Sequence, residues 1–399
     1  MDIVLITAIT PASENIRGTS ALPYHLLIHR PNDVRVTIYS YNFNQLTQQQ
    51  IEDVEAQLNV DIILLDTPKW FSLVLKCHLL LLRILLRLPF LSYVKLPIDL
   101  ENKIIASRPD CIWVYGEEIS GILDQFSSFK RMNLGPDSEA LYYYRMLGSR
   151  FVFSNTISYW RNIIMYPKYL RLENNYIVDK NVTYYVVGED DAKFVRNINP
   201  QVNVKFLRHP HYHVDSEQKP IHFHSPIRLL IAGQNNLYMN QDTIAFVNAL
   251  SQDTLSSAMK EKFEITFLGK GWESCVAQLE SHHWKVKQIT FAPDYIEEIK
   301  KHDIQITPIS VGTGTKGKVL DALSNGLLVI GSHYALENVA VSSGISCIEY
   351  EKPSDIVTVL KEVVDNPNKY EEFAIKGRHQ VLSEHSRTFI SKSLFESIG

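Results

Sequence analysis

Short apolar segments alternate with longer helical segments in two successive runs along the 399-residue chain. Segments in this rhythm are typical of βαβ units around a parallel sheet. The expected strands are residues 2–7, 34–41, 61–66, 110–116 and 181–188 in the first run, and 227–233, 263–269, 285–293, 303–310, 327–332 and 345–350 in the second. The sequence therefore predicts an α/β protein with two Rossmann-like domains that face each other across a cleft.

A polar segment separates the two runs. Residues 209–226, HPHYHVDSEQKPIHFHSP, contain three prolines and no apolar period, which is typical of a connection between domains. We expect an N-terminal domain over 1–212, a linker over 213–226 and a C-terminal domain over 227–385. A helix in the last residues, 386–399, is expected to cross back to the N-terminal domain.

The histidines of this segment raise the question of a metal site. His209, His211, His213, His222 and His224 fall within sixteen residues, and alternate spacing can chelate zinc. They have no cysteine or carboxylate partners in a fixed element, so a polar hinge is the favoured interpretation and no metal is expected.

The net charge and the cysteines indicate which partners and which compartment the sequence favours. Forty basic and 44 acidic residues leave a formal charge of -4, so the sequence does not favour a nucleic-acid partner. The four cysteines are scattered without C-x-x-C spacing, which favours a reducing compartment and a cytoplasmic protein. The N-terminus, MDIVLITAIT, has no basic region and is expected to be a strand and not a signal peptide.

The segment GTGTKGKV, residues 312–319, matches two nucleotide-binding patterns. A dinucleotide turn should follow the first strand of a unit and precede an acidic residue by about 20 positions, but this turn follows a late strand and the next strand does not end in an acid. A triphosphatase loop needs Ser or Thr after Lys318, and this chain has Val319. Neither function is expected.

Both patterns bind phosphate through a glycine loop and a helix N-terminus, and this feature is still expected here. A strand is expected to end at Ser310, glycines allow the backbone to approach a ligand, and a helix is expected to start near Lys316 with free N–H groups. This arrangement predicts a diphosphate site with Lys316 or Lys318 as countercharge. Asp321, beside the loop, could accept two ribose hydroxyls; alternatively it only complements the helix dipole.

ITPISVGTGTKGKVLDALSNGLLVIGS resembles the nucleotide-sugar-binding segment of retaining GT-B glycosyltransferases of the group 1 or family 4 type. Four more segments are similar to other parts of this family: residues 231–250, FEITFLGKGWE (263–273), MNLGPDSEALYYYR (132–145) and VVGEDDAKFV (186–195). The resemblance covers most of the chain and is specific around residues 290–340. It implies a GT-B fold, a nucleotide diphosphate sugar bound by the C-terminal domain, an acceptor bound by the N-terminal domain, and no cofactor or metal.

By this resemblance Lys318 is the phosphate cation and Asp321 the ribose ligand, with Lys270 as a second cation. Thr313 stands eight residues before Asp321, where many members carry the first acid of an E-x(7)-E pair, so contacts to the donor sugar stay unassigned. The remaining donor-binding residues expected are Gly18, Gly312, Thr313, Gly314, Thr315 and Lys316.

The resemblance places the acceptor at the N-terminal domain, near Arg17, Glu117, Asp137 and Glu139. Asp137 is expected to contact an acceptor hydroxyl, and with Lys318 it is the candidate catalytic residue. Two alternatives stay open: Arg17 is an incidental residue of a surface loop, or Asp137 caps the following helix.

Residues 69–96, KWFSLVLKCHLLLLRILLRLPFLSYVKL, are leucine-rich and basic. Lys69, Lys76, Arg83 and Arg87 recur at spacings of seven, seven and four, which places them on one stripe of a helix. The charges disfavour a membrane span of about 18 apolar residues. A helix in the interface of an anionic membrane is one interpretation, and a helix packed in the N-terminal domain is the other.

The expected function is transfer of a sugar, with retention, from a nucleotide sugar to a glycan or lipid-linked acceptor in bacterial surface polysaccharide synthesis. The enzyme would be cytoplasmic, with peripheral membrane contact if residues 69–96 touch a bilayer. The alternatives are a non-hydrolysing nucleotide-sugar epimerase and a catalytically degenerate GT-B scaffold that binds a partner enzyme.

Overall fold

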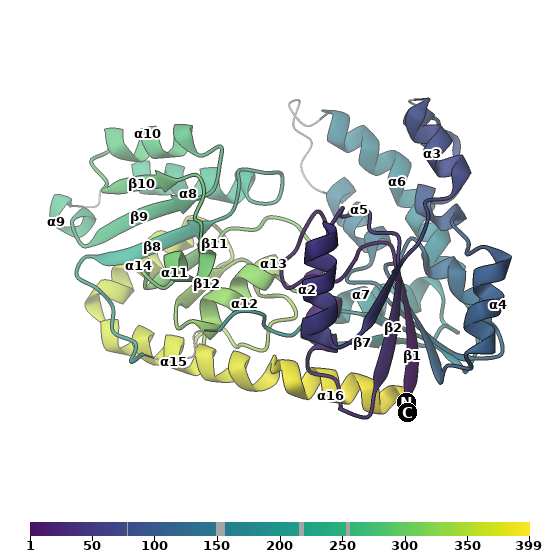
Figure 1. Cartoon of the computed structure of the whole chain (residues 1–399). Helices are drawn as coiled ribbons and strands as arrows, with labels where there is room; N and C mark the ends of the chain where they lie inside the picture. Colours follow the sequence, from purple (N-terminus) through teal and green to yellow (C-terminus); the bar gives the residue numbers. More distant parts are fainter. Residues whose placement is uncertain (78, 149–155, 215–218, 253–255) are drawn as a thin grey trace. The chain divides into compact units, whose positions relative to one another are not determined.

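The computed structural model describes residues 1–77, 79–148, 156–214, 219–252 and 256–399. They divide into two compact units (Figure 1). Unit 1 comprises Met1–Pro210 together with Arg387–Gly399, and unit 2 comprises His211–Ser386. The last segment of the chain thus belongs to the same unit as the first.

The described residues of unit 1 form a seven-stranded parallel sheet in the order β3-β2-β1-β4-β5-β6-β7. The order reverses between β1 and β4, and in such sheets ligands bind outside the carboxyl ends of the strands at this switch point. The strands are β1 (Asp2–Thr7), β2 (Arg35–Ser40), β3 (Asp61–Leu64), β4 (Cys111–Tyr115), β5 (Lys130–Leu134), β6 (Val182–Val186) and β7 (Val204–Phe206).

Helices and 3-10 turns connect these strands, as parallel pairing requires. They are α1 (Ala21–Leu27), α2 (Gln48–Leu58), α3 (Lys69–Lys76), η1 (Leu79–Leu85), η2 (Phe90–Tyr93), α4 (Ile98–Ala106), η3 (Ser120–Phe126), α5 (Glu139–Gly148), α6 (Thr156–Asn174) and α7 (Glu189–Ile198).

The C-terminal helix α16 (Arg387–Ile398) completes unit 1. Its Ser391 hydroxyl donates to the Leu26 carbonyl at 2.6 Å. The ring of Phe395 packs edge-on against Trp113 of β4, with 6.3 Å between ring centroids. Both rings are almost fully buried, so α16 contributes to the core of unit 1.

In the described part of unit 2, six parallel strands follow the order β10-β9-β8-β11-β12-β13. The order reverses between β8 and β11, which defines the switch point of this sheet. The strands are β8 (Ile227–Ala232), β9 (Phe263–Leu268), β10 (Val286–Ile289), β11 (Ile304–Thr307), β12 (Leu328–Gly331) and β13 (Ile348–Glu349).

Both faces of this sheet are buried. Successive side chains of a strand point to opposite faces, and Leu229 and Ile231 of β8 belong to one apolar cluster while Leu230 and Ala232 belong to another. The covering helices are α8 (Asn240–Gln252), α9 (Ser257–Lys260), α10 (Glu273–Ser281), α11 (Tyr295–Ile299), α12 (Gly317–Ser324), α13 (His333–Leu336), α14 (Asp355–Asp365) and α15 (Pro367–Glu384).

The expectation of one helix over residues 69–96 is wrong. The segment breaks into α3, η1 and η2, with Pro89 at the start of η2. A 3-10 helix has three residues per turn, so Arg83 in η1 does not continue the stripe of Lys69 and Lys76, and Arg87 lies outside any helix. All four basic side chains are nevertheless exposed. None of the described helices is both long and apolar enough to cross a membrane.

We predict that Phe395→Ala lowers the free energy of unfolding of unit 1 by about 3–5 kcal/mol, because it removes a buried aromatic ring and leaves a cavity. Urea unfolding followed by circular dichroism measures this change. Phe389→Ala on the same helix is the matched control, since its ring is 68% exposed and its loss should change stability by about 0.5 kcal/mol at most. Equal effects of the two substitutions would contradict the packing of α16 described above.

Candidate functional site

Two glycine turns meet at the carboxyl edge of the unit 2 sheet. Gly233 follows β8 and Gly269 follows β9, both with φ of +147°. A Cβ atom on Gly269 would lie 2.2 Å from the Gly233 carbonyl oxygen. The Trp272 indole also donates to this oxygen, at 2.7 Å. Only glycine allows this approach, and the two turns are fixed against each other.

The loop between β11 and α12 is held by its own neighbours. Asn338 donates from its amide to the Gly314 carbonyl at 3.1 Å, and the Ser310 hydroxyl donates to the Tyr238 carbonyl at 3.0 Å. The Lys316 ammonium donates to the carbonyls of Thr313 and Gly314. The side chain of Lys316 therefore stabilises the loop through hydrogen bonds to the loop's own backbone.

The first turn of α12 presents backbone N–H groups at this edge. The helix starts at Gly317, and no described side chain caps it. The first N–H groups of a helix lack intrahelical partners and carry partial positive charge. Buried Gln305 of β11 donates to the Lys318 carbonyl at 3.2 Å, which fixes the start of α12 beside the strand. The geometry suits an anion.

Lys318 brings a full positive charge to the same place. Its ammonium nitrogen lies 3.3 Å from the position that a Cβ atom on Gly233 would occupy. Among the described residues it has no hydrogen-bond or ion-pair partner. Burial lowers the pKa of Lys318, and the negative charge of Asp321 opposes this shift. The side chain is still accessible to solvent, so a ligand can reach the ammonium group.

Asp321 lies one turn further along α12 and is half-buried. Burial and the charge of Asp321 raise the pKa of Tyr295, whose buried hydroxyl has no partner within the described ranges. Lys270 is exposed on the turn after β9, where its carbonyl accepts the Asn235 N–H at 2.9 Å. Thus Lys270 and Lys318 follow different strands of one edge, whereas Lys316 is engaged within its loop.

In unit 1, three glutamates gather where β4 ends and α5 begins. The Glu139 N–H donates to Glu117 at 3.2 Å, and the Ala140 N–H donates to Glu173 at 2.8 Å. Burial is the main reason that the pKa of Glu139 rises to about 8 and that of Glu173 to about 7. Burial also raises the pKa of Glu117 well above its usual range. Glu173 was missed in the sequence, where it lies 34 residues beyond Glu139.

The interpretation of Asp137 as a helix cap is wrong. Ser138 is the cap of α5, because its hydroxyl oxygen accepts the Leu141 N–H at 3.1 Å. The Ser138 hydroxyl also donates to Glu173 at 2.7 Å, and its N–H donates to Asp191 at 2.7 Å. The charge of Asp137 contributes to the raised pKa of Glu139, which places the two carboxyl groups near each other.

Arg17 and Gly18 lie in the loop after β1. Arg17 has a φ of 51° and its guanidinium donates to the Gln45 side-chain oxygen. A Cβ atom on Gly18 would lie 2.5 Å from the side chain of Ile9. Arg17 is thus tied to the segment after β2, while Glu117, Asp137 and Glu139 gather after β4 and β5.

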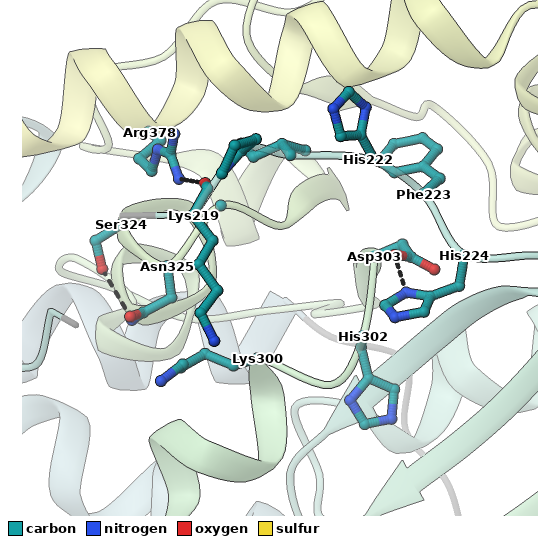
Figure 2. Close-up of a pocket in the computed structure, with 13 residues that line it drawn as sticks. Lys219, His222, Phe223, His224, Lys300, His302, Asp303, Ser324, Asn325 and Arg378 are labelled. Carbon is teal, nitrogen blue, oxygen red and sulfur yellow. Dashed lines mark hydrogen bonds and ion pairs between the residues drawn. The ribbon is translucent and has the colours of Figure 1, made fainter. Parts of the chain in front are cut away.

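The histidines after the unit boundary pack onto unit 2. The ring of His224 lies 2.7 Å from the buried carboxylate of Asp303, and His222 lies 3.3 Å from Glu371. They line a cavity of about 320 Å³ with Arg378, at the edge where β11 begins (Figure 2). No group of three metal-binding side chains occurs among the residues that the structure describes. These histidines therefore hold the connecting segment to unit 2.

No protein-family model and no curated protein matches the chain. Solved structures match it over its whole length. Sucrose-phosphate synthase from Thermosynechococcus elongatus has a TM-score of 0.64 and 9% identity, covering 100% of this chain and 98% of that chain. Anabaena HepE in complex with UDP has a TM-score of 0.62 and 11% identity, with coverages of 100% and 99%. WaaG, a glycosyltransferase involved in lipopolysaccharide biosynthesis, has a TM-score of 0.59 and 11% identity, with 99% of each chain covered. The chain has the α/β GT-B fold.

The raised pKa of Glu139 predicts a pH dependence of stability. The folded state holds this proton up to about pH 8, whereas the usual carboxyl pKa is 4.5. The unfolded state therefore releases the proton first, and Glu139 makes unit 1 less stable as the pH rises between these values. Glu139→Gln should reduce this fall in the free energy of unfolding, measured by urea unfolding at several pH values. Glu52→Gln, on the exposed face of α2, should not change it; an unchanged fall in Glu139→Gln would contradict the burial described here.

Proposed function

We propose that this chain is a retaining glycosyltransferase of the group 1 or family 4 type, using a nucleotide diphosphate sugar as donor. The observation that carries the proposal is the uncapped start of α12 beside the ammonium group of Lys318, at the switch point of the unit 2 sheet. Backbone N–H groups and a cation are what a diphosphate requires. The structures of HepE with UDP, with UDP and glucose, and with UDP-glucose support it.

In this proposal the diphosphate lies against the N–H groups of residues 312–318, with Lys318 as its countercharge. When the sugar–phosphate bond breaks, negative charge develops on the leaving diphosphate. Dipoles and a cation that are already oriented stabilise this charge without reorganisation. Asp321 accepts hydrogen bonds from the ribose hydroxyls, Lys270 adds a second positive charge, and Lys316 keeps the loop in shape. Thr313 and Thr315 contribute backbone and hydroxyl groups.

The acceptor binds unit 1 in the same proposal. Asp137 contacts the acceptor hydroxyl and Arg17, on the loop after β1, adds positive charge, whereas Gly18 of the same loop is assigned to the donor. Burial raises the pKa values of Glu117 and Glu139 and so favours the neutral carboxyl group, which can donate a hydrogen bond to a sugar hydroxyl. A protonated carboxyl group has this donor and an ionised one does not.

The acceptor is a glycan or a lipid-linked saccharide of bacterial surface polysaccharide synthesis. Lys69, Lys76, Arg83 and Arg87 are exposed beside exposed leucines such as Leu81 and Leu85. Basic and apolar side chains together suit the interface of an anionic membrane, so the enzyme would act as a peripheral protein on the cytoplasmic face. The function named for WaaG, lipopolysaccharide biosynthesis, supports this assignment.

Lys318→Met is predicted to weaken binding of a nucleoside diphosphate about 10- to 100-fold, since a hydrogen bond to a charged group contributes about 1.5–3 kcal/mol. Isothermal titration calorimetry with UDP, GDP and ADP measures it and selects the base. The matched control is Lys287→Met, on the exposed edge strand β10, which should bind as the unaltered protein does. No binding of any nucleoside diphosphate would overturn the proposal and favour a scaffold.

Asp321→Asn is predicted to weaken binding of the selected nucleoside diphosphate about tenfold but to leave the affinity for its 2′,3′-dideoxy analogue unchanged, because only the ribose hydroxyls meet the carboxylate. Calorimetry with both ligands tests the assignment. Equal losses for both ligands would show that Asp321 acts on the fold of the loop and not on the ribose.

Retention is tested on the product. With donor and acceptor present, proton NMR of the new glycosidic bond should show the anomeric configuration of the donor. An inverted product would contradict the retaining assignment. Conversion of the donor to its epimer without any acceptor would instead identify an epimerase.

A further inference from the structure

A second cavity, of about 450 Å³, opens within unit 1 among α3, η2 and α6. Aromatic rings form much of its wall. Phe43 stacks on Phe71 with 5.3 Å between ring centroids, and Phe71 lies 5.0 Å from Phe90. Met165 of α6 adds to the apolar lining. All four side chains stay partly exposed, so the cavity offers apolar surface to a ligand and lies in the size range of small-molecule sites, about 300–1,000 Å³.

One wall of this cavity is positively charged. Arg83 of η1 is exposed there, and the buried Lys168 of α6 donates to the carbonyls of Arg83 and Ile84 at 2.5 and 3.1 Å. An ammonium group has three donors, so one remains. Within the described ranges, neither Arg83 nor Lys168 forms an ion pair with a carboxylate. Burial lowers the pKa of Lys168, with the charges of Arg83 and Arg171 adding to the effect, as expected for positive charge that has no counterion.

The single carboxylate in the lining is already engaged. Glu118 accepts hydrogen bonds from the Tyr169 hydroxyl and from the Leu91 N–H. Gln45 also lines the cavity and accepts from Arg17. The polar end of the cavity therefore adjoins a residue that the proposed function assigns to the acceptor.

The surface around the cavity is unusually apolar. Leu81 and Leu85, on either side of Arg83, are 77% and 79% exposed, and Leu73 of α3 is 60% exposed. Exposed apolar groups concentrated in one segment indicate a contact surface. Basic residues among them favour an anionic membrane over a protein partner.

We propose that this cavity binds the apolar chain of a membrane amphiphile whose anionic head lies against Arg83 and Lys168. The inference rests on the proposed function, because it makes this amphiphile the carrier of the sugar acceptor. The aromatic wall formed by Phe43, Phe71 and Phe90 accommodates the chain, and the two cations select a phosphate-type head over a neutral or cationic one. The acceptor is then a lipid-linked saccharide and not a free glycan.

The direct test is calorimetric titration of the protein with decyl phosphate, a phosphate-headed amphiphile used below its micelle concentration. We expect one molecule bound per chain, and at least tenfold weaker binding of decyltrimethylammonium, which has the opposite charge. Met165→Trp fills the cavity and should weaken binding of decyl phosphate at least tenfold. Arg83→Gln should weaken it about threefold to tenfold. Ile157→Ser, the matched surface control on the same helix as Met165, should leave binding of this probe unchanged, since Ile157 is 87% exposed and lies outside the cavity lining.

The fluorescence of Trp70 provides a second test of binding that does not depend on the cavity-filling substitution Met165→Trp. The Trp70 ring lies edge-on to Phe90 at 5.3 Å and is 39% exposed, so decyl phosphate should change its fluorescence. In Trp70→Phe this change should disappear while calorimetric binding remains. If Met165→Trp does not fold, this pair of measurements still decides whether the probe enters the cavity.

Failure of the inference is distinguishable from failure of the proposed function. Absence of decyl phosphate binding, or binding that Met165→Trp and Arg83→Gln leave intact, overturns the inference even if UDP, GDP or ADP binds. Equal affinity for both head groups overturns the role of the cations. Normal binding of decyl phosphate by a protein that binds no nucleoside diphosphate would leave the cavity as a lipid site and remove its role in sugar transfer.

Discussion

The hydrogen bonds from buried Gln305 to the Lys318 carbonyl and to the Thr307 hydroxyl fix the start of α12 against β11. Everything proposed for the donor depends on this placement. Because the helix starts at the carboxyl edge of the sheet, its N–H groups and Lys318 occupy the switch point between β8 and β11. The contacts of Lys316 and Asn338 with loop carbonyls then hold the intervening loop. A site whose donors are oriented before binding loses less free energy to ordering when the ligand arrives.

In unit 1, the acidic side chains that stabilise the start of α5 also repel one another. The start of α5 is capped by Ser138 and surrounded by Glu117, Glu173 and Asp191, and acids near a helix N-terminus are favourable. Several acids in one buried place cannot all ionise without repulsion. Burial is the main cause of the raised pKa values of Glu117 and Glu139, and the charges of the neighbouring carboxylates add to it. Neutral carboxyl groups of this kind can donate hydrogen bonds to a ligand, which ionised groups cannot.

Most strands could be predicted because buried parallel strands are continuous apolar runs. DIVLIT (β1) and LVIG (β12) are examples. β5 was missed because it begins with Lys130 and Arg131. Arg131 is only 3% exposed, since it pairs with Asp179 at 2.5 Å. Asp179 is 48 residues away in the chain. The local sequence around Arg131 therefore does not reveal the carboxylate that compensates its buried charge.

The candidate site was predictable in position but not in detail. The glycines and lysines of residues 312–318 indicated a phosphate site, because that chemistry depends on local backbone. Sequence alone could not separate Lys316 from Lys318, which differ by two positions and by the direction of one side chain. The basic stripe of residues 69–96 failed as a prediction because helical spacing applies only while a helix continues, and this one ends at Lys76.

The same spacing argument missed the aromatic cavity. Phe43, Phe71 and Phe90 come from three separate segments of unit 1, after β2, in α3 and in η2. Their stacking is a tertiary contact that no local pattern indicates. In contrast, the basic and leucine-rich composition of residues 69–96 did indicate an unusual surface, and the exposure of Leu81 and Leu85 agrees with that composition.

The measurement that tests the central claim most directly is amide hydrogen exchange, followed by mass spectrometry, with and without a saturating nucleoside diphosphate. A diphosphate bound at the start of α12 should slow exchange in residues 312–320, because their N–H groups donate to it. It should also slow exchange around Gly233 and Gly269, at the neighbouring turns. Unchanged exchange in residues 312–320 despite saturation, with slowing confined to other segments, would contradict the proposed donor site.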